Sequence, residues 1–444
     1  MDESIHYLLS LIASMQLCDQ IVNVFAVDVA GKEQCIVAAE HAWSLETLKI
    51  TIAEASNIPY GELRLILGGS ACVDGRSSLR TLFGCRDVAT VTLVHVKTKF
   101  DNRTLKEAVK LWVEDEEQAL QLYGPLPYWD VSAVTDMSHM FNGASSFNQP
   151  VAAWNTAHVT DMSCMFCGAS SFNQPVATWN TANVTAMTCM FGGARSFNQP
   201  VVAWNTANVT YMDHMFYGAR SFDQPVDAWN IANVTDMSYM FSGSSSFNQS
   251  VSAWNTANVT LMTGMFQSAA SFNQPVAAWN TSKVTDMSCM FECAISFNQP
   301  VAAWITANVT TMMRMFEGAR SFNHPVAAWN TAIVTDMNHM FYGALSFNQP
   351  VAAWNTANVA DMSGMFQSAG TFDQPVAAWN TANVTTMSRM FEGASSFNQP
   401  VADWNTANVT TMFRIFEGAS SYNQSLAAWN TANATTMTCM FGVE

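Results

Sequence analysis

The stretch "VTDMSHMFNGASSFNQPVAAWN", residues 134–155, returns with substitutions along most of this 444-residue chain. Its SFNQP segment begins at residues 146, 171 and 196, and variants follow every 25 residues as far as residue 421. Tryptophan keeps the same step from Trp129 to Trp429, which makes thirteen copies. A fixed period of this length predicts a solenoid, in which each coil buries its apolar face against neighbouring coils.

Apolar residues recur at fixed positions inside each coil and predict its local structure. In the first coil they are Val134, Met137, Met140, Phe141, Ala144, Phe147, Val151 and Trp154. The spacing between residues 134 and 144 predicts one or two turns of helix, while Pro150 and the following "VAAW" predict a short strand. The sequence therefore predicts an α/β solenoid of thirteen 25-residue coils over residues 129–444, with the rings of Phe147 and Trp154 in its core.

Two polar columns also stay nearly constant, where a column is the set of residues at one position in successive coils, named by its number in the first coil. Asparagine fills column 148 and threonine fills column 135 in most coils. We expect these side chains to stack and to satisfy the backbone of the turns. A threonine array could instead meet ice or carbohydrate, but Thr156 and Thr160 lie four residues apart across a turn, which disfavours an ice-binding strand.

Columns 136, 139, 142 and 145 vary most between coils. Their i, i+3 spacing predicts that they share one solvent-exposed helical face. We interpret this face as a candidate protein-binding surface; the alternative is neutral drift with incidental ion pairs worth about 0.3–0.5 kcal/mol each. The candidate protein-binding residues on it are Arg314, Glu317, Arg320, Arg389, Glu392, Arg414 and Glu417.

Cys164 and Cys167 form a CxxC pattern of the kind that redox dithiols and zinc sites use. The chain has no second CxxC at metal-site spacing, and no thioredoxin-like βαβ context surrounds this one. Column 139 begins with His139, Cys164, Cys189 and His214. Neighbours about 4.8 Å apart along a stack cannot all reach one ion. The sequence therefore predicts tolerated surface thiols, with no metal site and no cofactor.

The repeat unit at residues 134–155 resembles the BspA-type leucine-rich repeat of bacterial and mycoplasma surface proteins, which is also abundant in unicellular algae. The resemblance covers residues 129–444. It implies a leucine-rich-repeat-like solenoid that serves binding or adhesion and has no catalytic activity. No nucleophile–base pair, glycine-rich phosphate loop or carboxylate pair stands out from the repeat pattern, so the sequence predicts no catalytic residue.

Residues 21–97 carry no repeat and predict a small α+β domain. The segment "IVNVFAVDVAGKEQCIVAAE" alternates as two strands around Gly31-Lys32, and "SLETLKITIAEASN" predicts a helix capped by Ser44. The segment "VATVTLVHV" predicts a final strand. A β-hairpin, a helix and a strand in this order make a compact sheet with one helix on it.

Residues 44–96 are similar to ubiquitin in the helix, in Ile58-Pro59, in "LRLILGG" and "DGRSSL", and in the closing strand. The resemblance implies a β-grasp fold whose apolar face, with Ile66 and Val94, docks ubiquitin receptors or the proteasome. The alternative is that both are ordinary, partly exposed strand residues. "KTKFDNRT" replaces the diglycine tail and Ser70 replaces the chain-linking lysine, which implies an embedded ubiquitin-like module.

Residues 98–128 predict a helical N-terminal cap for the solenoid. Leu105, Ala108, Val109 and Trp112 follow helical spacing, and Asp115 begins a second helix that ends at Gly124-Pro125. We expect residues 1–20 to be a tail or a short helix.

Charge and composition limit the partners. The formal net charge is −16, with −6 over residues 1–125 and −10 over the remainder, so neither part offers the basic surface that nucleic acid requires. Asp2 and Glu3 replace the basic start of a secretory signal, and no stretch is long enough to span a membrane. We therefore expect a cytoplasmic, non-enzymatic protein–protein interaction scaffold. The alternative is a surface or extracellular adhesion protein that binds protein or glycan through its repeats.

Overall fold

The computed structural model describes residues 21–27, 33–40, 43–56, 63–67, 70–71, 88–95 and 99–441. Two compact units divide the chain: one comprises Met1–Ala133 with Ala153–Asn155, and the other comprises Val134–Ala152 with Thr156–Glu444. The expected tail or helix at residues 1–20, the Gly31-Lys32 turn and the "DGRSSL" segment lie outside the described residues.

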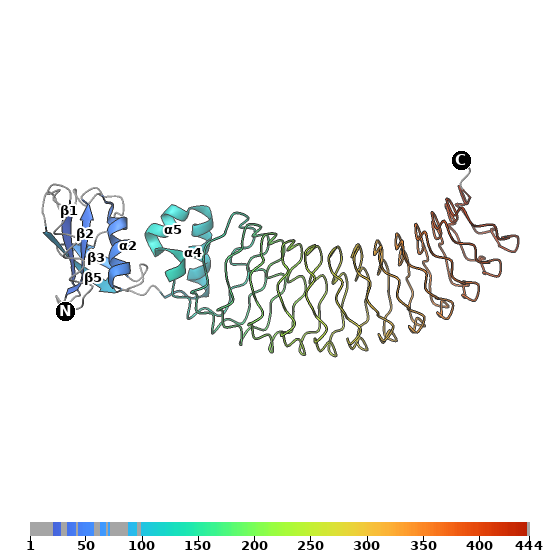
Figure 1. Ribbon diagram of the computed structural model, residues 1–444, viewed down its shortest axis with the longest axis horizontal. Helices are drawn as coiled ribbons and strands as arrows, with labels where there is room; N and C mark the ends of the chain where they lie inside the picture. The colour runs from blue at the N-terminus through green and yellow to red at the C-terminus, as the bar shows by residue number, and fades with distance from the viewer. Residues whose placement is uncertain are drawn as a thin grey trace. The chain divides into compact units, whose positions relative to one another are not determined.

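Among the described residues before Lys99, the first unit has a five-stranded mixed sheet and the helix α2 (Figure 1). Its elements are β1 (Ile21–Val27), β2 (Glu33–Glu40), α2 (Leu45–Ser56), β3 (Leu63–Leu67), β4 (Ser70–Ala71) and β5 (Val88–His95). The strand order is β2-β1-β5-β3-β4, with β5 parallel to β1 and antiparallel to β3. The predicted hairpin, helix and final strand are confirmed.

Helix α2 begins at the predicted cap, because the Ser44 hydroxyl accepts a hydrogen bond from the Thr47 backbone N–H at 3.1 Å. Leu48 and Ile52 on its inner face are fully buried. Val37 and Ala39 of β2 are buried as well, and β2 contacts α2. These alternate residues mark the face of the sheet that α2 covers.

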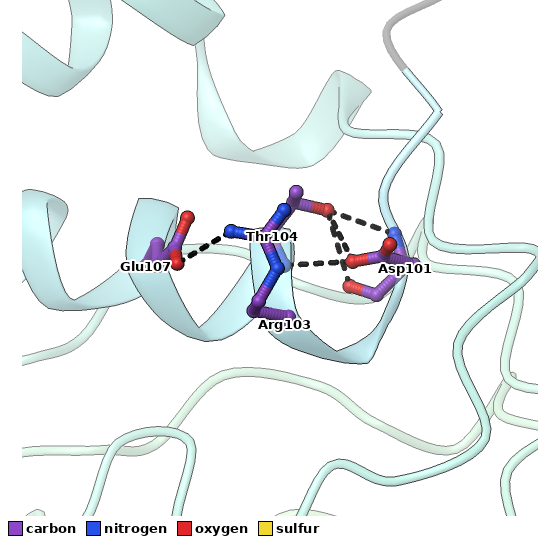
Figure 2. A network of polar contacts seen from close by, with 4 residues as sticks. All are labelled: Asp101, Arg103, Thr104 and Glu107. Atoms are coloured by element: carbon purple, nitrogen blue, oxygen red, sulfur yellow. Dashed lines mark hydrogen bonds and ion pairs between the residues drawn. The ribbon is translucent and has the colours of Figure 1, made fainter.

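Two further helices follow, α4 (Asn102–Glu114) and α5 (Glu116–Tyr123), and then a 3₁₀ turn, η2 (Leu126–Tyr128). The Asp101 carboxylate accepts a hydrogen bond from the Thr104 N–H at 2.8 Å, and the Thr104 hydroxyl oxygen accepts one from the Asp101 N–H at 2.9 Å. The two bonds together form a capping box (Figure 2). Asp115 ends α4 and caps α5. The buried residues of α4 are Leu105, Ala108, Val109 and Trp112, as predicted.

In the second unit the coils stack in register (Figure 1). The Met137 N–H donates to the Asp161 carbonyl of the next coil at 2.9 Å, and the Phe141 N–H donates to the Met165 carbonyl at 2.8 Å. Single-residue parallel bridges join column 136 from Asp136–Asp161 through to Thr411–Thr436. Each coil therefore satisfies part of its backbone through the neighbouring coils and part through turns of its own, such as the Phe147 N–H donating to the Ala144 carbonyl at 3.0 Å.

The predicted helical turn and short strand of each coil are wrong. Residues 129–441 contain turns and single bridges but no helix and no extended strand. Column 139 has a φ between +52° and +59° wherever it is not glycine, and column 143 has a positive φ as well, so no helix can pass through them. The "VAAW" segment closes a turn, shown by the Trp279 N–H donating to the Val276 carbonyl at 3.2 Å.

Aromatic ladders fill the core of the stack, as the recurring Phe and Trp positions predict. Within one coil, the rings of Phe166 and Phe172 stack with centroids 3.9 Å apart. The Phe166 ring also lies 5.6 Å from Phe191 of the next coil. Each such ring contributes about 1.5–3 kcal/mol gross on burial, and it does so only when both neighbouring coils are present.

The constant polar columns satisfy the backbone between coils, which confirms their predicted role. The Asn148 side-chain oxygen accepts from the Asn173 N–H at 2.9 Å, and the Thr160 hydroxyl donates to the Thr135 carbonyl at 3.1 Å. The buried Trp179 indole N–H donates to the Val151 carbonyl at 3.0 Å. With core and ladder positions fixed in this way, the variable columns are left to differ from coil to coil.

Candidate functional site

Columns 136, 139, 142 and 145 form what we call the variable face. Most of its residues are half-buried or exposed, as expected, but several are buried: Gly192, Ser242, Gly264, Cys289, Gly364 and Gln367. Gly264 and Gly364 belong to column 139, and each is covered by the column-139 side chain of the preceding coil. A Cβ at Gly264 would meet the Tyr239 ring, and one at Gly364 would meet the His339 ring at 2.6 Å. The variable face is therefore built from turns, and some of its residues are buried. The prediction of one fully exposed helical face is wrong.

The left-handed backbone of column 139 positions the predicted arginines. Arg314, Arg389 and Arg414 have φ values of 55°, 59° and 54°. Such a conformation costs a non-glycine residue about 1–2 kcal/mol, and backbone bonds to the next coil hold it in place. The Arg389 N–H, for example, donates to the Phe413 carbonyl at 2.7 Å. The backbone beneath each arginine is therefore fixed.

Each of these arginines pairs with the glutamate three residues later. The Nε–Oε2 distance is 3.6 Å for Arg314–Glu317, 3.6 Å for Arg389–Glu392 and 2.9 Å for Arg414–Glu417. The arginine side chains are 37–45% exposed and the glutamates 15–30%. Each half-buried carboxylate therefore holds a guanidinium that remains open to solvent. Arg320, in column 145, is exposed.

Two of these pairs form a larger cluster around Phe413. The guanidinium carbon of Arg389 lies 5.3 Å from the Phe413 ring centroid, and that of Arg414 lies 4.9 Å from it. Glu392 also reaches Arg414, with 3.9 Å between Oε1 and Nη1. We call Arg389, Glu392, Phe413, Arg414 and Glu417 the 389–417 cluster. Cation–π contacts of this kind contribute about 0.5–1 kcal/mol each at exposed sites. They therefore help to hold the two guanidiniums beside the Phe413 ring although the arginines are partly exposed.

The Arg314–Glu317 pair has a different environment. Burial raises the pKa of the Glu317 carboxyl, Arg314 opposes the rise, and Glu292 in the preceding coil adds to it. Glu292 accepts a hydrogen bond from the Gln267 amide at 2.9 Å. Glu292 thus adds a second carboxylate close to Glu317, so this pair has less positive charge to offer a partner than the 389–417 cluster has.

The structure places Ile66 in β3 and Val94 in β5. Ile66 pairs with Thr92 and Arg64 pairs with Val94, so the register puts all four positions on one face of the sheet. The register across β1 and β5 places this face opposite to the one that carries Val37 and Ala39. Ile66 and Val94 are therefore together on the face away from α2, and their role in docking stays a prediction.

Two features of the variable face escaped sequence reasoning. Phe413 stands in column 138, which otherwise holds mostly small polar residues, and that contrast was the available signal. His214 stacks on Tyr239 of the next coil with centroids 5.0 Å apart and contacts Tyr217 at 5.8 Å. The His and Tyr in neighbouring positions of column 139 were visible, but their contact depends on how the side chains lean.

Within the described part of the chain, no group of three His, Cys, Asp or Glu side chains has the arrangement of a metal site. The described helices also include none with the length and apolar character needed to cross a membrane.

Four overlapping segments of the chain match the family described as "Mycoplasma protein of unknown function, DUF285": residues 115–229, 199–304, 272–366 and 349–443. The matched segments contain all the stacked coils described above. The chain belongs to this family. As in its description, membership brings no known activity, and the function has to be argued from the site.

Two solved structures, both of one Arabidopsis thaliana protein, are similar to part of this chain. The first is 17% identical with a TM-score of 0.16, and covers 17% of this chain and 87% of that one. The second, of that protein's ubiquitin-like domain, is 17% identical with a TM-score of 0.16, and covers 18% of this chain and 83% of that one. No curated protein is significantly similar in sequence.

Proposed function

We propose that this DUF285 protein is a non-enzymatic interaction scaffold that binds a protein partner through the variable face of its repeats. The observation that carries the proposal is the 389–417 cluster, in which two solvent-open guanidiniums flank an aromatic ring over a hydrogen-bonded stack. Arg and aromatic residues dominate the binding energy of protein interfaces, and fixed ones lose little entropy on binding.

The chemistry of the cluster selects the partner. Arg389 and Arg414 each keep more than a third of their side-chain surface exposed, whereas Glu392 and Glu417 are more buried. A partner segment with carboxylates and one apolar side chain would complement the two guanidiniums and the Phe413 ring. Because the whole chain carries a net charge of −16, the two guanidiniums of the cluster would favour the approach of an acidic segment to this place over much of the remaining surface.

The finer architecture belongs to the same proposal. The stacked coils would form a leucine-rich-repeat-like solenoid of the BspA type, with α4 and α5 as its N-terminal cap. The sheet and α2 would form a ubiquitin-like β-grasp module embedded in the chain. Ile66 and Val94 share the face of the sheet opposite to α2, which supports a second docking surface for a ubiquitin receptor or the proteasome.

We place the protein in the cytoplasm, with a surface location as the alternative. The repeats contain Asn-X-Thr glycosylation sequons, such as Asn183-Val184-Thr185. Their asparagines support a cytoplasmic location, because the Asn183 side-chain amide donates to the Ala157 carbonyl of the preceding coil at 2.7 Å. Asn208 repeats the contact with Ala182 at 2.8 Å. A glycan on the same amide nitrogen would crowd the neighbouring coil. Resistance to external protease on intact source cells, without a glycosidase shift, would support the cytoplasm; degradation with a shift would support the surface.

Affinity capture with paired variants tests the proposed function. The purified chain captures partners from its source cells, and the binding of each is compared with that of Arg389→Ala/Arg414→Ala. Truncating a central interface residue costs about 2 kcal/mol or more of binding free energy, so the double variant should bind the true partner more weakly, by about 30-fold or more. Arg195→Ala/Arg220→Ala is the matched control, since both are exposed arginines in consecutive coils. Equal binding by both double variants would exclude the cluster as the binding site.

A further inference from the structure

Three cysteines of the repeats come together across two neighbouring coils. Cys164 and Cys167 belong to one coil and Cys189 to the next, and all three are half-buried. The sulfur atoms of Cys167 and Cys189 lie 3.4 Å apart. A disulfide requires about 2.05 Å, so a modest rotation of the two side chains would bring the sulfurs within bonding distance. Neither the proposed function nor the family accounts for this contact.

Gly192 makes the contact between Cys167 and Cys189 possible. It occupies column 142, where Asn142, Cys167, Tyr217 and Ser242 carry side chains, and a Cβ at Gly192 would collide with the Cys189 sulfur. Gly192 does not have a positive φ, unlike Gly193 beside it. The glycine is therefore required here for space and not for backbone conformation. That space lets the Cys189 side chain turn towards column 142, where Cys167 stands in the preceding coil.

We propose that Cys167 and Cys189 are a redox modification site that forms a reversible disulfide between neighbouring coils, with glutathione disulfide as the oxidant. The Cys167 thiolate attacks one sulfur of glutathione disulfide, which breaks that bond and releases one glutathione thiolate. The Cys189 thiol gives its proton to solvent and attacks the Cys167 sulfur, releasing the second glutathione thiolate. Two protein thiols are oxidised, one glutathione disulfide is reduced, and the two glutathione thiolates take up protons.

The environment of the sulfurs makes this a slow, structural cross-link. Burial raises the pKa of both the Cys164 and the Cys189 thiol. Neither is therefore an activated nucleophile of the kind that thioredoxin-like enzymes use. The cross-link would add a covalent bond between two coils that are otherwise joined by one backbone connection, hydrogen bonds and packing, and so would restrain their separation.

The experiment uses the full chain, which carries ten cysteines. The reduced protein is equilibrated with a glutathione/glutathione disulfide mixture, remaining thiols are blocked with N-ethylmaleimide, and the denatured protein is digested with chymotrypsin. Cleavage after Phe166 separates Cys164 from Cys167. Mass spectrometry should find a peptide pair joined through Cys167 and Cys189 that disappears after reduction. Alkylated Cys167 and Cys189 without this pair, or a link of either to Cys164 in its place, would overturn the proposal.

Variants distinguish the specific contact from general oxidation. Cys164→Ser should keep the Cys167–Cys189 link, and Cys167→Ser should abolish it. Gly192→Ala should lose most of the link while it retains the circular dichroism spectrum of the reduced wild type, because the new Cβ displaces the Cys189 sulfur and requires only a small shift of the Cys189 carbonyl oxygen, 3.3 Å away. Cys289 and Cys293, two cysteines of a single coil, should stay alkylated throughout. An undiminished link in a folded Gly192→Ala protein would also contradict the proposal.

Discussion

Helix α4 and residues 137–144 of the first coil bury side chains at the same i, i+3, i+4, i+7 spacing, yet their backbones find different partners. In α4 the chain bonds to itself, as in the Leu105 N–H donating to the Asp101 carbonyl at 3.0 Å. In the coil, the Phe141 N–H donates instead to Met165 of the next coil. The same apolar spacing is thus compatible with two sources of backbone hydrogen bonds.

The difference lies in what surrounds the apolar positions. Helix α4 has a capping box at Asp101 and no residue of positive φ between its caps. The coil has a positive φ at His139 and at Gly143, two and six residues into the segment, and each interrupts the helical path. Apolar spacing shows which side chains are buried, while caps and left-handed residues decide which backbone groups pair. Four predictions test this comparison.

The largest effect should come from removing one ring from the middle of the stack. Phe266 contacts the rings of Phe241, Phe272, Trp279 and Phe291. Phe266→Ala should lower the free energy of unfolding of the repeats by about 3–5 kcal/mol, because a cavity opens between coils that have few other links. Urea unfolding followed by tryptophan fluorescence measures it. Leu122→Ala, on the exposed face of α5, should change stability by less than about 0.5 kcal/mol.

Much of this structure could be predicted from the sequence, and the failures share one cause. The caps at Ser44 and Asp115, the buried face of α4 and the asparagine and threonine ladders all follow from local chemistry. The turns of the coils do not, because column 139 adopts a left-handed conformation even with Cys, Tyr and Arg, which normally avoid it.

The candidate site divides in the same way. The Arg–Glu pairs lie three residues apart in one coil, so their spacing predicts their contact. Phe413 between two arginines, and Cys189 against Cys167, join different columns of different coils. Such contacts depend on the direction in which each side chain leaves a left-handed residue, and a linear pattern does not contain that direction.

A second prediction concerns the positive φ of column 143. Gly193 has a φ of 70°, and a Cβ there would lie 3.4 Å from the Gly168 nitrogen. Gly193→Ala should destabilise the repeats by about 1–2 kcal/mol, since alanine disfavours this conformation. Ser368→Ala is the matched control at the same column and should have little effect. Alanine at exposed Lys110 of α4 should be neutral or slightly stabilising, because alanine favours helix. Equal losses at all three positions would contradict the comparison.

A third prediction is that glycine has opposite effects in the two regions. In α4, Lys106→Gly should destabilise by about 1 kcal/mol, the usual cost of glycine inside a helix. In column 139, His139→Gly should instead stabilise by about 0.5–1 kcal/mol, because it relieves a φ of 58° at an exposed residue. Thermal unfolding of the two variants against the wild type gives the signs. A loss of stability in both would show that the left-handed residues are not strained.

The smallest effect should be the pH dependence of the α4 cap. Hydrogen bonds from the Thr104 backbone and hydroxyl lower the pKa of the Asp101 carboxyl below its usual value. The folded state therefore favours the carboxylate, so its contribution is present above the unfolded pKa of about 3.9 and is lost as the pH falls through the folded value. Asp101→Asn keeps a capping oxygen but cannot titrate. Hydrogen exchange of α4 amides should be slower in the wild type than in Asp101→Asn at pH 7, and this difference should vanish once the pH has fallen through the lowered folded pKa of Asp101. The amides of the first coil, which bond to the next coil and not to this cap, should exchange equally in both proteins at either pH. A difference that persisted at the lower pH would assign the protection to geometry and not to charge.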